Sequence, residues 1–285
     1  MDAEVYYYTE HAEMIKVLIE AGTIPERQSK YGAMTICTAA RYDHRDTVKL
    51  LLHIGIDPNS RVRSGQYPLH MTMAGDYQEL TGLLIEVGSN LNAVDLTGAT
   101  PLHHAAKHNR YKAAALLIEA GANPSLKDIY CNTALHYAAR YNSYEVIELL
   151  IKRGVDLNAA GAIGYTALHE SAVGGHIEII KLLINVSADS NCLDEFHRNP
   201  LYQASAKGHI EAMELLVQAG TRVNTHGDTA LHRASREGHI SAVELLLRLG
   251  ADRSILNGVG RTAYDVAKND AVRELLKPIS WCRVQ

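Results

Sequence analysis

The chain has 285 residues, of which 47% are apolar, and its 28 Lys and Arg against 32 Asp and Glu give a net charge of -4. This composition excludes an intrinsically disordered chain, and the slight acidity argues against bulk binding to nucleic acid. No apolar run reaches membrane-spanning length, and the first residues lack a signal-peptide pattern, so we expect neither membrane insertion nor a secretory leader.

The first segment of the chain predicts one clear helix, over residues 11–20, which Ala21-Gly22 ends. Glycine suits this place because it adopts the left-handed conformation after a helix without a Cβ penalty. Tyr6-Tyr7-Tyr8 precedes this helix, where the following segments carry pairs of alanines. Two interpretations stay open: the tyrosines cap the end of the fold, or the chain begins part-way through a repeat.

From residue 34 onward the sequence repeats with a period of 33 residues. A four-residue word marks the period: Tyr-Pro-Leu-His at 67–70, Thr-Pro-Leu-His at 100–103, and Thr-Ala-Leu-His at 133–136 and 166–169. The register continues to Asn199, shortens to 30 residues before Thr229, and returns to 33 at Thr262. A fixed period of this length indicates a stack of similar units rather than one globular core.

The unit that starts at Thr100 predicts how each repeat folds. Thr100-Pro101 opens a first helix, since a hydroxyl caps the free amides of a helix start and proline is tolerated in the first turn. A second helix follows from Tyr111 to Glu119, and Ala120-Gly121 ends it. Two short helices bury their apolar faces only against neighbouring units, so the alanine pairs and Leu-Leu pairs should form one continuous core.

These features resemble the ankyrin repeat, as do Gly-His-Ile-Glu at 175–178 and 208–211 and Gly-His-Ile-Ser at 238–241. The resemblance covers nearly the whole chain and implies an all-α fold, an ankyrin-repeat solenoid of stacked helix-turn-helix units with β-turn or hairpin-like loops. We expect a single array over residues 1–285. Its expected units are a partial one at 1–28, then 29–61, 62–94, 95–127, 128–160, 161–193, 194–223, 224–256, a C-terminal cap at 257–278 and a short tail at 279–285.

The resemblance also implies a function. It indicates a protein-protein interaction scaffold or adaptor that binds a partner through its concave surface and is not an enzyme. Two alternatives remain: an inhibitory or regulatory ankyrin protein that masks a partner, or the ankyrin portion of a larger protein such as a channel, kinase or secreted bacterial effector. Phosphate-binding loops, nucleophile elbows and zinc-protease motifs are absent from the sequence.

Histidines are the most tempting candidates for chemistry. Five of them stand at the fourth position of the word, and the resemblance implies that they hold neighbouring units in register: His70, His103, His136, His169 and His232. One per unit is too widely spaced to share a metal. His104 and His108 could face the same way as a zinc pair, but the sequence offers no third ligand, so we expect no metal and no cofactor.

Asparagines recur in the loops after the second helices: Asn59, Asn92, Asn158, Asn191 and Asn224. Each has a leucine eight residues before it, which resembles the ankyrin substrates of the intracellular asparagine hydroxylase. The interpretation that we favour is simpler: asparagine suits a turn because its side chain bonds nearby backbone.

The four cysteines are scattered and form no CxxC motif: Cys37, Cys131, Cys192 and Cys282. Cys37 takes the place of the repeat histidine and Cys131 that of a turn glycine, so neither is expected to be half of a disulfide. This pattern favours a reducing, intracellular location, in the cytoplasm or the nucleus.

Units six to eight carry most of the departures from the repeat. His197 replaces a turn glycine, as Cys131 does earlier, and Ser187 replaces the glycine after a second helix. A left-handed residue other than glycine is costly. Together with the three residues missing before Thr229, these changes predict local loosening or altered curvature there.

The resemblance places a partner on the concave face, which is built from turn tips and first helices. Two features mark it: aromatic and branched residues at tips that should be exposed, and a row of Lys and Arg on the first helices with few acids beside them. We expect a monomer that binds another protein, through an acidic extended segment, and that loses this binding without losing stability when Arg41, Lys107 and Arg140 are reversed in charge. The predicted partner-binding residues are Tyr31, Arg41, Tyr42, Lys107, His108, Ile129, Tyr130, Arg140, Tyr141, Ile163, Tyr165, Phe196, Lys207 and Arg236.

Overall fold

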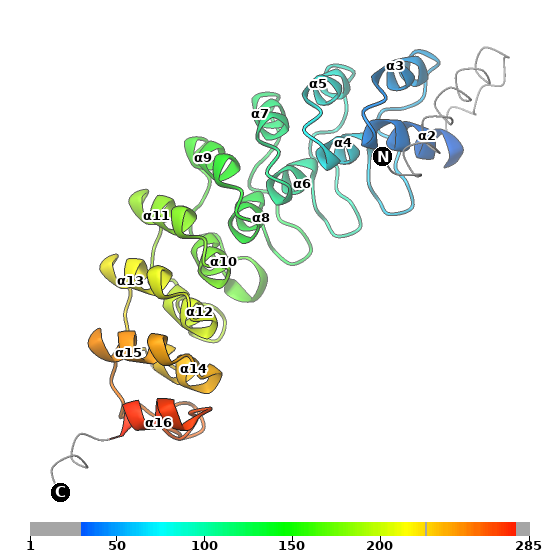
Figure 1. Cartoon of the computed structure of the whole chain (residues 1–285). Helices are drawn as coiled ribbons and strands as arrows, with labels where there is room; N and C mark the ends of the chain where they lie inside the picture. The colour runs from blue at the N-terminus through cyan, green and yellow to red at the C-terminus, as the bar shows by residue number, and fades with distance from the viewer. Residues whose placement is uncertain (1–29, 226, 278–285) are drawn as a thin grey trace, which may run out of the picture.

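The computed structural model describes residues 30–225 and 227–277. The helix expected at 11–20, Tyr6-Tyr7-Tyr8 and Cys282 lie outside these residues. The described part is a curved array of helix pairs, with one row of helices on the inside of the curve and one on the outside (Figure 1). It contains helices and turns and no β-strand, so the prediction of an all-α solenoid is confirmed.

We call the helices on the inside of the curve the inner helices. They are α2 (Lys30–Arg41), α4 (Pro68–Met71) with the short η1 (Thr72–Ala74), α6 (Pro101–Lys107), α8 (Ala134–Arg140), α10 (Ala167–Gly174), α12 (Pro200–Lys207) and α14 (Ala230–Glu237). The outer helices are α3 (Arg45–His53), α5 (Gln78–Glu86), α7 (Tyr111–Glu119), α9 (Tyr144–Lys152), α11 (Ile177–Asn185), α13 (Ile210–Gln218), α15 (Ile240–Arg248) and α16 (Asp270–Leu276).

Helix α6 begins as its sequence predicts. The Thr100 hydroxyl accepts the N–H of His103 at 3.4 Å, and Nδ1 of His103 accepts the N–H of Thr100 at 3.1 Å, so two amides at the helix start are satisfied reciprocally. Helix α7 spans the predicted residues and is followed by Gly121 at φ +98°, in the left-handed region. The local signals of the repeat therefore set the helix boundaries.

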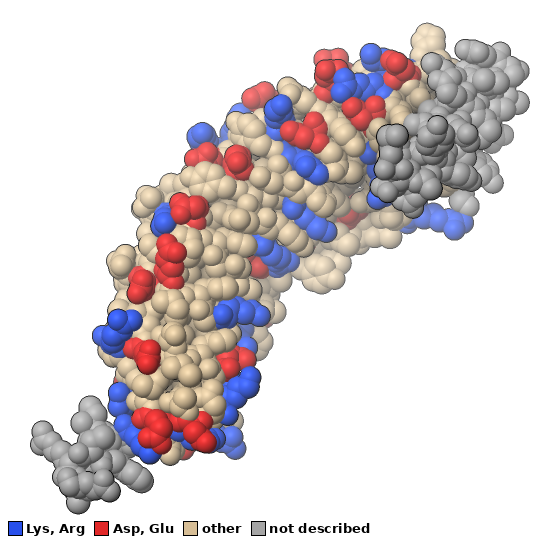
Figure 2. Space-filling view, in the orientation of Figure 1, with Lys and Arg blue, Asp and Glu red and all other residues tan. Residues whose placement is uncertain are grey.

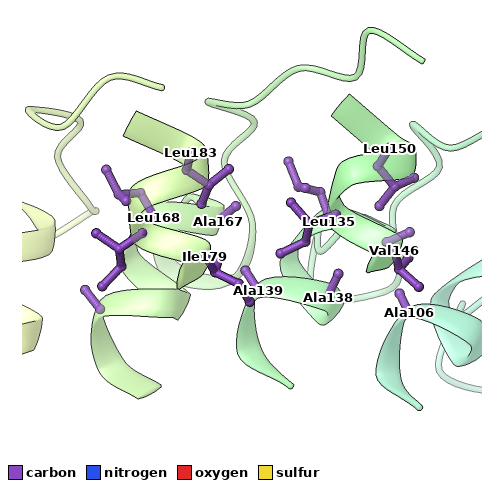
Figure 3. Close-up of a cluster of buried hydrophobic side chains, with 14 of the residues drawn as sticks. Ala106, Leu135, Ala138, Ala139, Val146, Leu150, Ala167, Leu168, Ile179 and Leu183 are labelled. Atoms are coloured by element: carbon purple, nitrogen blue, oxygen red, sulfur yellow. The ribbon is translucent and has the colours of Figure 1, made fainter. Parts of the chain in front are cut away.

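The core is a continuous layer between the two rows of helices (Figure 3). Alanines such as Ala138 and Ala139 are fully buried where successive inner helices approach, and Val146 and Leu150 fill the space beneath the outer helix. Both leucines are buried in two of the Leu-Leu pairs, 149–150 and 245–246. Every pair contributes one leucine that is completely or almost completely buried: Leu51, Leu84, Leu117, Leu150, Leu183, Leu216, Leu246 and Leu276. Burial of one such side chain contributes roughly 1.5–3 kcal/mol, so these positions hold the units together.

Hairpin-like loops connect each outer helix to the next inner helix and extend past the inner row (Figure 1). Apart from the shortened loop before α14, each is closed by a backbone bond between residues four apart, as between Asp95 N–H and Ala99 O at 3.0 Å. One loop contains the short helix η2 (Ala162–Gly164). In the last unit the inner helix is replaced by turns after Thr262, and α16 covers the end of the core. Every helix among the described residues is too short or too polar to cross a membrane.

Candidate partner-binding surface

The fourth position of the repeated word links each unit to the next. In His103 the ring Nδ1 accepts a backbone N–H, so Nε2 carries the proton and donates to Asn132 O in the following loop at 3.0 Å. The same pair of bonds recurs at His70, His136, His169 and His232. Both ring nitrogens are used in each case, so these histidines have no nitrogen left for a metal or a substrate.

Burial keeps four of these five imidazoles neutral. It lowers the pKa of His103, His136 and His169, and it lowers the pKa of His70 to about 4, with the neighbouring His104 as the next cause. A neutral imidazole donates its single proton to the next unit, which is the state that the link requires.

Two units make this link without histidine. Cys37 Sγ lies 3.9 Å from Gln66 O, and burial raises the pKa of its thiol to about 12. Tyr202 extends its hydroxyl to Asp228, which accepts at 2.9 Å. Both residues stand at the fourth position of their units, so the sequence identifies them as linking residues. Nothing in the sequence shows that Tyr202 binds a side chain rather than a carbonyl.

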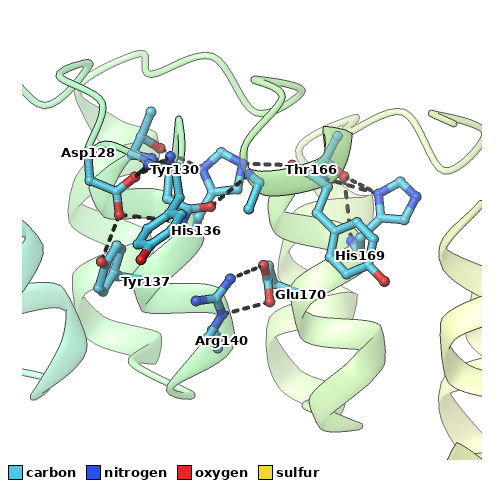
Figure 4. A network of polar contacts seen from close by, with 12 residues as sticks. Asp128, Tyr130, His136, Tyr137, Arg140, Thr166, His169 and Glu170 are labelled. Carbon is cyan, nitrogen blue, oxygen red and sulfur yellow. Dashed lines mark hydrogen bonds and ion pairs between the residues drawn. The ribbon is translucent and has the colours of Figure 1, made fainter. Parts of the chain in front are cut away.

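The basic row on the inner helices is only partly free. Lys and Arg recur along the inner edge of the curve (Figure 2), and Arg41, Lys107 and Lys207 are exposed. Arg140, however, binds Glu170 through Nε at 2.9 Å and Nη2 at 2.5 Å (Figure 4). Arg236 binds both carboxylate oxygens of Asp228, at 2.9 and 3.0 Å. The sequence predicted a row of Lys and Arg with few acids beside it, and at these two positions carboxylates from other elements pair with the guanidinium groups.

The loop tips carry the exposed apolar side chains that the sequence predicted. Ile129 and Phe196 are each 62% exposed, Tyr130 is 59% exposed and Ile163 is 44% exposed. Leu96, on the preceding loop, is exposed as well. These tips follow one another on neighbouring units, so they extend the inner helices into one surface, which we call the inner surface.

The other predicted residues divide into surface and structural positions. Tyr141 and His108 are exposed at the C-terminal ends of α8 and α6. Tyr42 is half-buried after α2, with its ring 6.3 Å from that of His44.

Two tyrosines were misplaced by the prediction. Tyr165 is half-buried, with its ring stacked on His169 at 5.3 Å, so it packs against the helix instead of standing at a tip. Tyr31 was expected in a turn, but α2 already begins at Lys30, so its backbone is helical.

A hollow of about 480 Å³ opens on the inner surface at the middle of the array. It lies between the loops before α6, α8 and α10, and its walls include Lys107, Tyr130, Tyr137, Arg140 and Tyr141. The Tyr137 hydroxyl donates to Asp128 at 2.8 Å, and burial together with this carboxylate raises the pKa of Tyr137 (Figure 4). The wall is thus built from side chains that the repeat fixes in place.

Comparison with known families accounts for most of the chain. A model described as ankyrin repeats (3 copies) matches residues 128–194 and 175–257, one described as ankyrin repeats (many copies) matches 73–118 and 102–151, and one described as ankyrin repeat matches 36–63. The chain belongs to the ankyrin repeat family. Ankyrin repeats are generally a protein-protein interaction module.

Solved ankyrin structures resemble this array. The ankyrin repeat domain of human ASB11 is 25% identical with a TM-score of 0.68, over 74% of this chain and 96% of that one. The ankyrin repeat domain of Bcl-3, a member of the IkappaB protein family, is 31% identical with a TM-score of 0.63, over 76% of this chain and 100% of that one. The comparison with curated proteins found no match.

The loop asparagines of this ankyrin array bridge neighbouring units. Asn92 Oδ1 accepts the N–H of Asn123 at 2.9 Å, and Asn158 Oδ1 accepts that of Asp189 at the same distance. The same bond recurs at Asn59, Asn191 and Asn224. Asparagine is thus required for contacts between units, whereas the sequence suggested contacts within one turn.

His104 and His108 do not form a metal pair. His104 Nε2 lies 2.8 Å from Asp95 Oδ2, and this contact joins α6 to its own loop. Burial opposes ionisation of Asp95, but hydrogen bonds from Thr97 and His104 outweigh it and lower the pKa of this carboxyl. Within residues 30–225 and 227–277, no three His, Cys, Asp or Glu side chains converge to hold a metal.

Proposed function

We propose that this ankyrin array is an intracellular scaffold or adaptor that binds a partner protein through an acidic, extended segment on the inner surface. The observation that supports it is the combination of exposed cations on α6 and α12, Lys107 and Lys207, with exposed aromatic side chains on the adjacent tips, Tyr130 and Phe196. Aromatic residues beside cations are typical of the side chains that dominate protein interfaces. A monomer is sufficient for this role, because the inner surface lies on one chain.

Lys107 and Lys207 are the cations to test. Neither forms an ion pair within the described residues, so their reversal to Glu removes attraction for an acidic partner without breaking a bridge inside the protein. Arg140 is unsuitable, because its loss would leave the carboxylate of Glu170, whose side chain is 5% exposed, without its partner. That change would cost roughly 2 kcal/mol of stability, allowing for the partly exposed guanidinium.

The experiment is affinity capture with three forms of the full chain. The test variant is Lys107→Glu/Lys207→Glu, and the matched control is Lys49→Glu/Lys112→Glu, which makes the same change of charge on exposed residues of the outer helices α3 and α7. We expect a captured protein to be retained by the wild type and the control, and to bind the test variant at least tenfold more weakly. A protein that binds all three forms equally would place the interaction elsewhere.

A regulatory ankyrin protein that masks a partner is the second candidate. It is favoured by the 31% identity to the ankyrin repeat domain of Bcl-3, a member of the IkappaB protein family. Masking and bridging differ in stoichiometry. An adaptor holds two different proteins at once, so recovery of a ternary complex by size-exclusion chromatography supports bridging, whereas a strictly binary complex in which the partner loses its own activity supports masking.

A further inference from the structure

The central hollow combines cations with aromatic side chains, the two features that mark the inner surface. It brings together Lys107 from α6, Arg140 and Tyr141 from α8, and Tyr130 from the loop between them. At about 480 Å³ it is large enough to receive one or two side chains of a partner. Its chemistry therefore defines what kind of side chain it accepts.

The carboxylates around the hollow are already satisfied. The Asp95 side chain is 7% exposed and accepts from Thr97, Ala99 and His104. Asp128 is buried and accepts from two backbone amides of its loop and from the Tyr137 hydroxyl. These acids are used to stabilise their own loops and the helices beside them.

The cations are the charged groups that a ligand meets. Lys107 is exposed at the end of α6, with Nζ 5.6 Å from the centre of the Tyr141 ring. This cation–π contact places the ammonium at the wall of the hollow. Because such contacts are weak at exposed sites, little interaction energy is lost when the ammonium turns towards a ligand. Arg140 uses Nε and Nη2 on Glu170, which leaves Nη1 to bind a further acceptor. An anionic group entering the hollow thus finds two donors.

Tyrosines supply the apolar part of the wall. Tyr130 is 59% and Tyr141 is 45% exposed, and the Tyr137 and Tyr141 rings are stacked with their centres 6.3 Å apart. Tyrosine offers a large, rigid contact area at low entropic cost, which is why it is enriched in binding surfaces. These tyrosines and the two cations line the same hollow.

We propose that this hollow is the anchor of the partner segment, and that it takes an acidic side chain together with an apolar side chain two residues away. This inference rests on the proposed function. In an extended chain alternate side chains point to the same face about 6.8 Å apart. One segment can therefore place both side chains in the hollow, where the Lys107 ammonium lies 5.6 Å from the centre of the Tyr141 ring. The carboxylate binds Lys107 and Arg140, and the apolar side chain packs between Tyr130 and Tyr141.

The test uses a random library of linear 12-residue peptides displayed on phage and selected against the full chain. Enriched peptides are then synthesised, and their affinities are measured by fluorescence polarisation. We expect them to share an acidic and an apolar residue two positions apart. Their affinity should fall at least tenfold with Lys107→Glu and about tenfold with Tyr141→Ala. It should fall less than twofold with Lys112→Glu, the matched control on the outer helix α7. Lys207→Glu is measured as well, because Lys207 lies on the same inner surface.

The following outcomes would contradict the proposal that the hollow is the anchor. Peptides that depend on Lys207 and not on Lys107 would move the anchor to α12 and leave the proposed function intact. Enrichment of basic peptides, or of none, would contradict the acidic extended ligand. The variant Tyr141→Ala is checked by circular dichroism for wild-type helicity, and Lys107→Glu carries the conclusion if that variant fails to fold. Failure of the proposed function is seen separately, in the capture with Lys107→Glu/Lys207→Glu.

Discussion

Two hydrogen bonds link a unit to the next one with different chemistry: one starts from His103 in α6 and the other from Tyr202 in α12. We call these contacts the joint after α6 and the joint after α12. His103 donates from Nε2 to Asn132 O, 29 residues later, whereas Tyr202 donates from its hydroxyl to the carboxylate of Asp228, 26 residues later. Both donors stand at the fourth position of the word, and both acceptors immediately precede the next word. The three residues missing from the second loop account for the difference in separation.

The difference teaches that the repeat constrains the position of the link more strongly than its residue type. The longer phenol reaches a side chain where the imidazole reaches the backbone, and Asp228 is held for it by Arg236. The two joints differ in their response to acid. The first requires a neutral histidine, and the second requires an ionised carboxylate.

Lowering the pH should give the largest difference in stability between the two joints. Burial holds the pKa of His70, His103, His136 and His169 below the ordinary value near 6.5, so the unfolded chain takes up protons first. Their contribution to stability is full above pH 6.5 and falls as the pH drops towards 4, by at most about 1.4 kcal/mol per pH unit for each histidine. Chemical unfolding in urea at pH 7.5 and 5.0 measures the loss.

The joint after α12 should resist this change. Burial opposes ionisation of Asp228, but bonds from Arg236 and Tyr202 outweigh it and lower the pKa of this carboxyl, so its link persists until the pH falls below the ordinary value near 4. Native-state hydrogen exchange between pH 7 and 5, corrected for intrinsic rates, should therefore show a larger loss of protection in α8 than in α12. Helix α8 carries His136 and directly follows the loop that His103 binds. An equal loss in both helices would refute the contrast.

Substitution separates the two links at neutral pH. His103→Ala removes a buried ring and leaves the Thr100 N–H and Asn132 O unpaired, so we expect a cost of about 3 kcal/mol. Tyr202→Phe keeps the ring and leaves Asp228 bound to Arg236, so its cost should be about 1 kcal/mol. Urea unfolding measures both. If Tyr202→Phe costs as much as His103→Ala, the hydroxyl bond rather than ring packing holds the second joint.

Substitutions at the left-handed residues of the loop turns should change the stability least. Cys131 adopts φ +64°, where every other described loop except that of His197 uses glycine, so Cys131→Gly should stabilise by about 0.5 kcal/mol after the entropy of glycine is counted. Gly98→Ala is the converse: its Cβ would lie 2.9 Å from Ile129 N, at a φ of +74°, so it should destabilise by about 1 kcal/mol. Thermal unfolding of both variants checks the opposite signs, and a destabilised Cys131→Gly would show that the thiol is needed there.

The predicted loosening of units six to eight stays a prediction. The left-handed conformation expected at Cys131, Ser187 and His197 is present. The shortened loop is nevertheless crossed by the bond from Tyr202 to Asp228 and by one from Asn199 Nδ2 to Arg222 O at 2.8 Å. The hydrogen-exchange profile at pH 7 tests it, since a looser stretch exchanges faster.

Much of the fold could be predicted from the sequence, because the signals for each helix are local. The threonine caps, the glycines after the outer helices and the alternation of small and large apolar residues lie within one unit, so α6 and α7 were placed correctly. The candidate surface was harder to predict. The bond from Arg140 to Glu170 joins residues 30 apart, and the stacking of Tyr165 on His169 depends on how the loop returns to the helix.

The sequence by itself determined the number and phase of the described units, their helix pairs and the positions of their links, because a 33-residue period can bury its apolar faces only by stacking. The tertiary structure decided which charges remain free and where the inner surface is hollow. The physical reason is that a charge is neutralised by whatever lies within a few ångströms of it in space. Arg140 and Lys107 are equivalent in the repeat, but only Arg140 has a buried carboxylate, that of Glu170, beside it in the next unit.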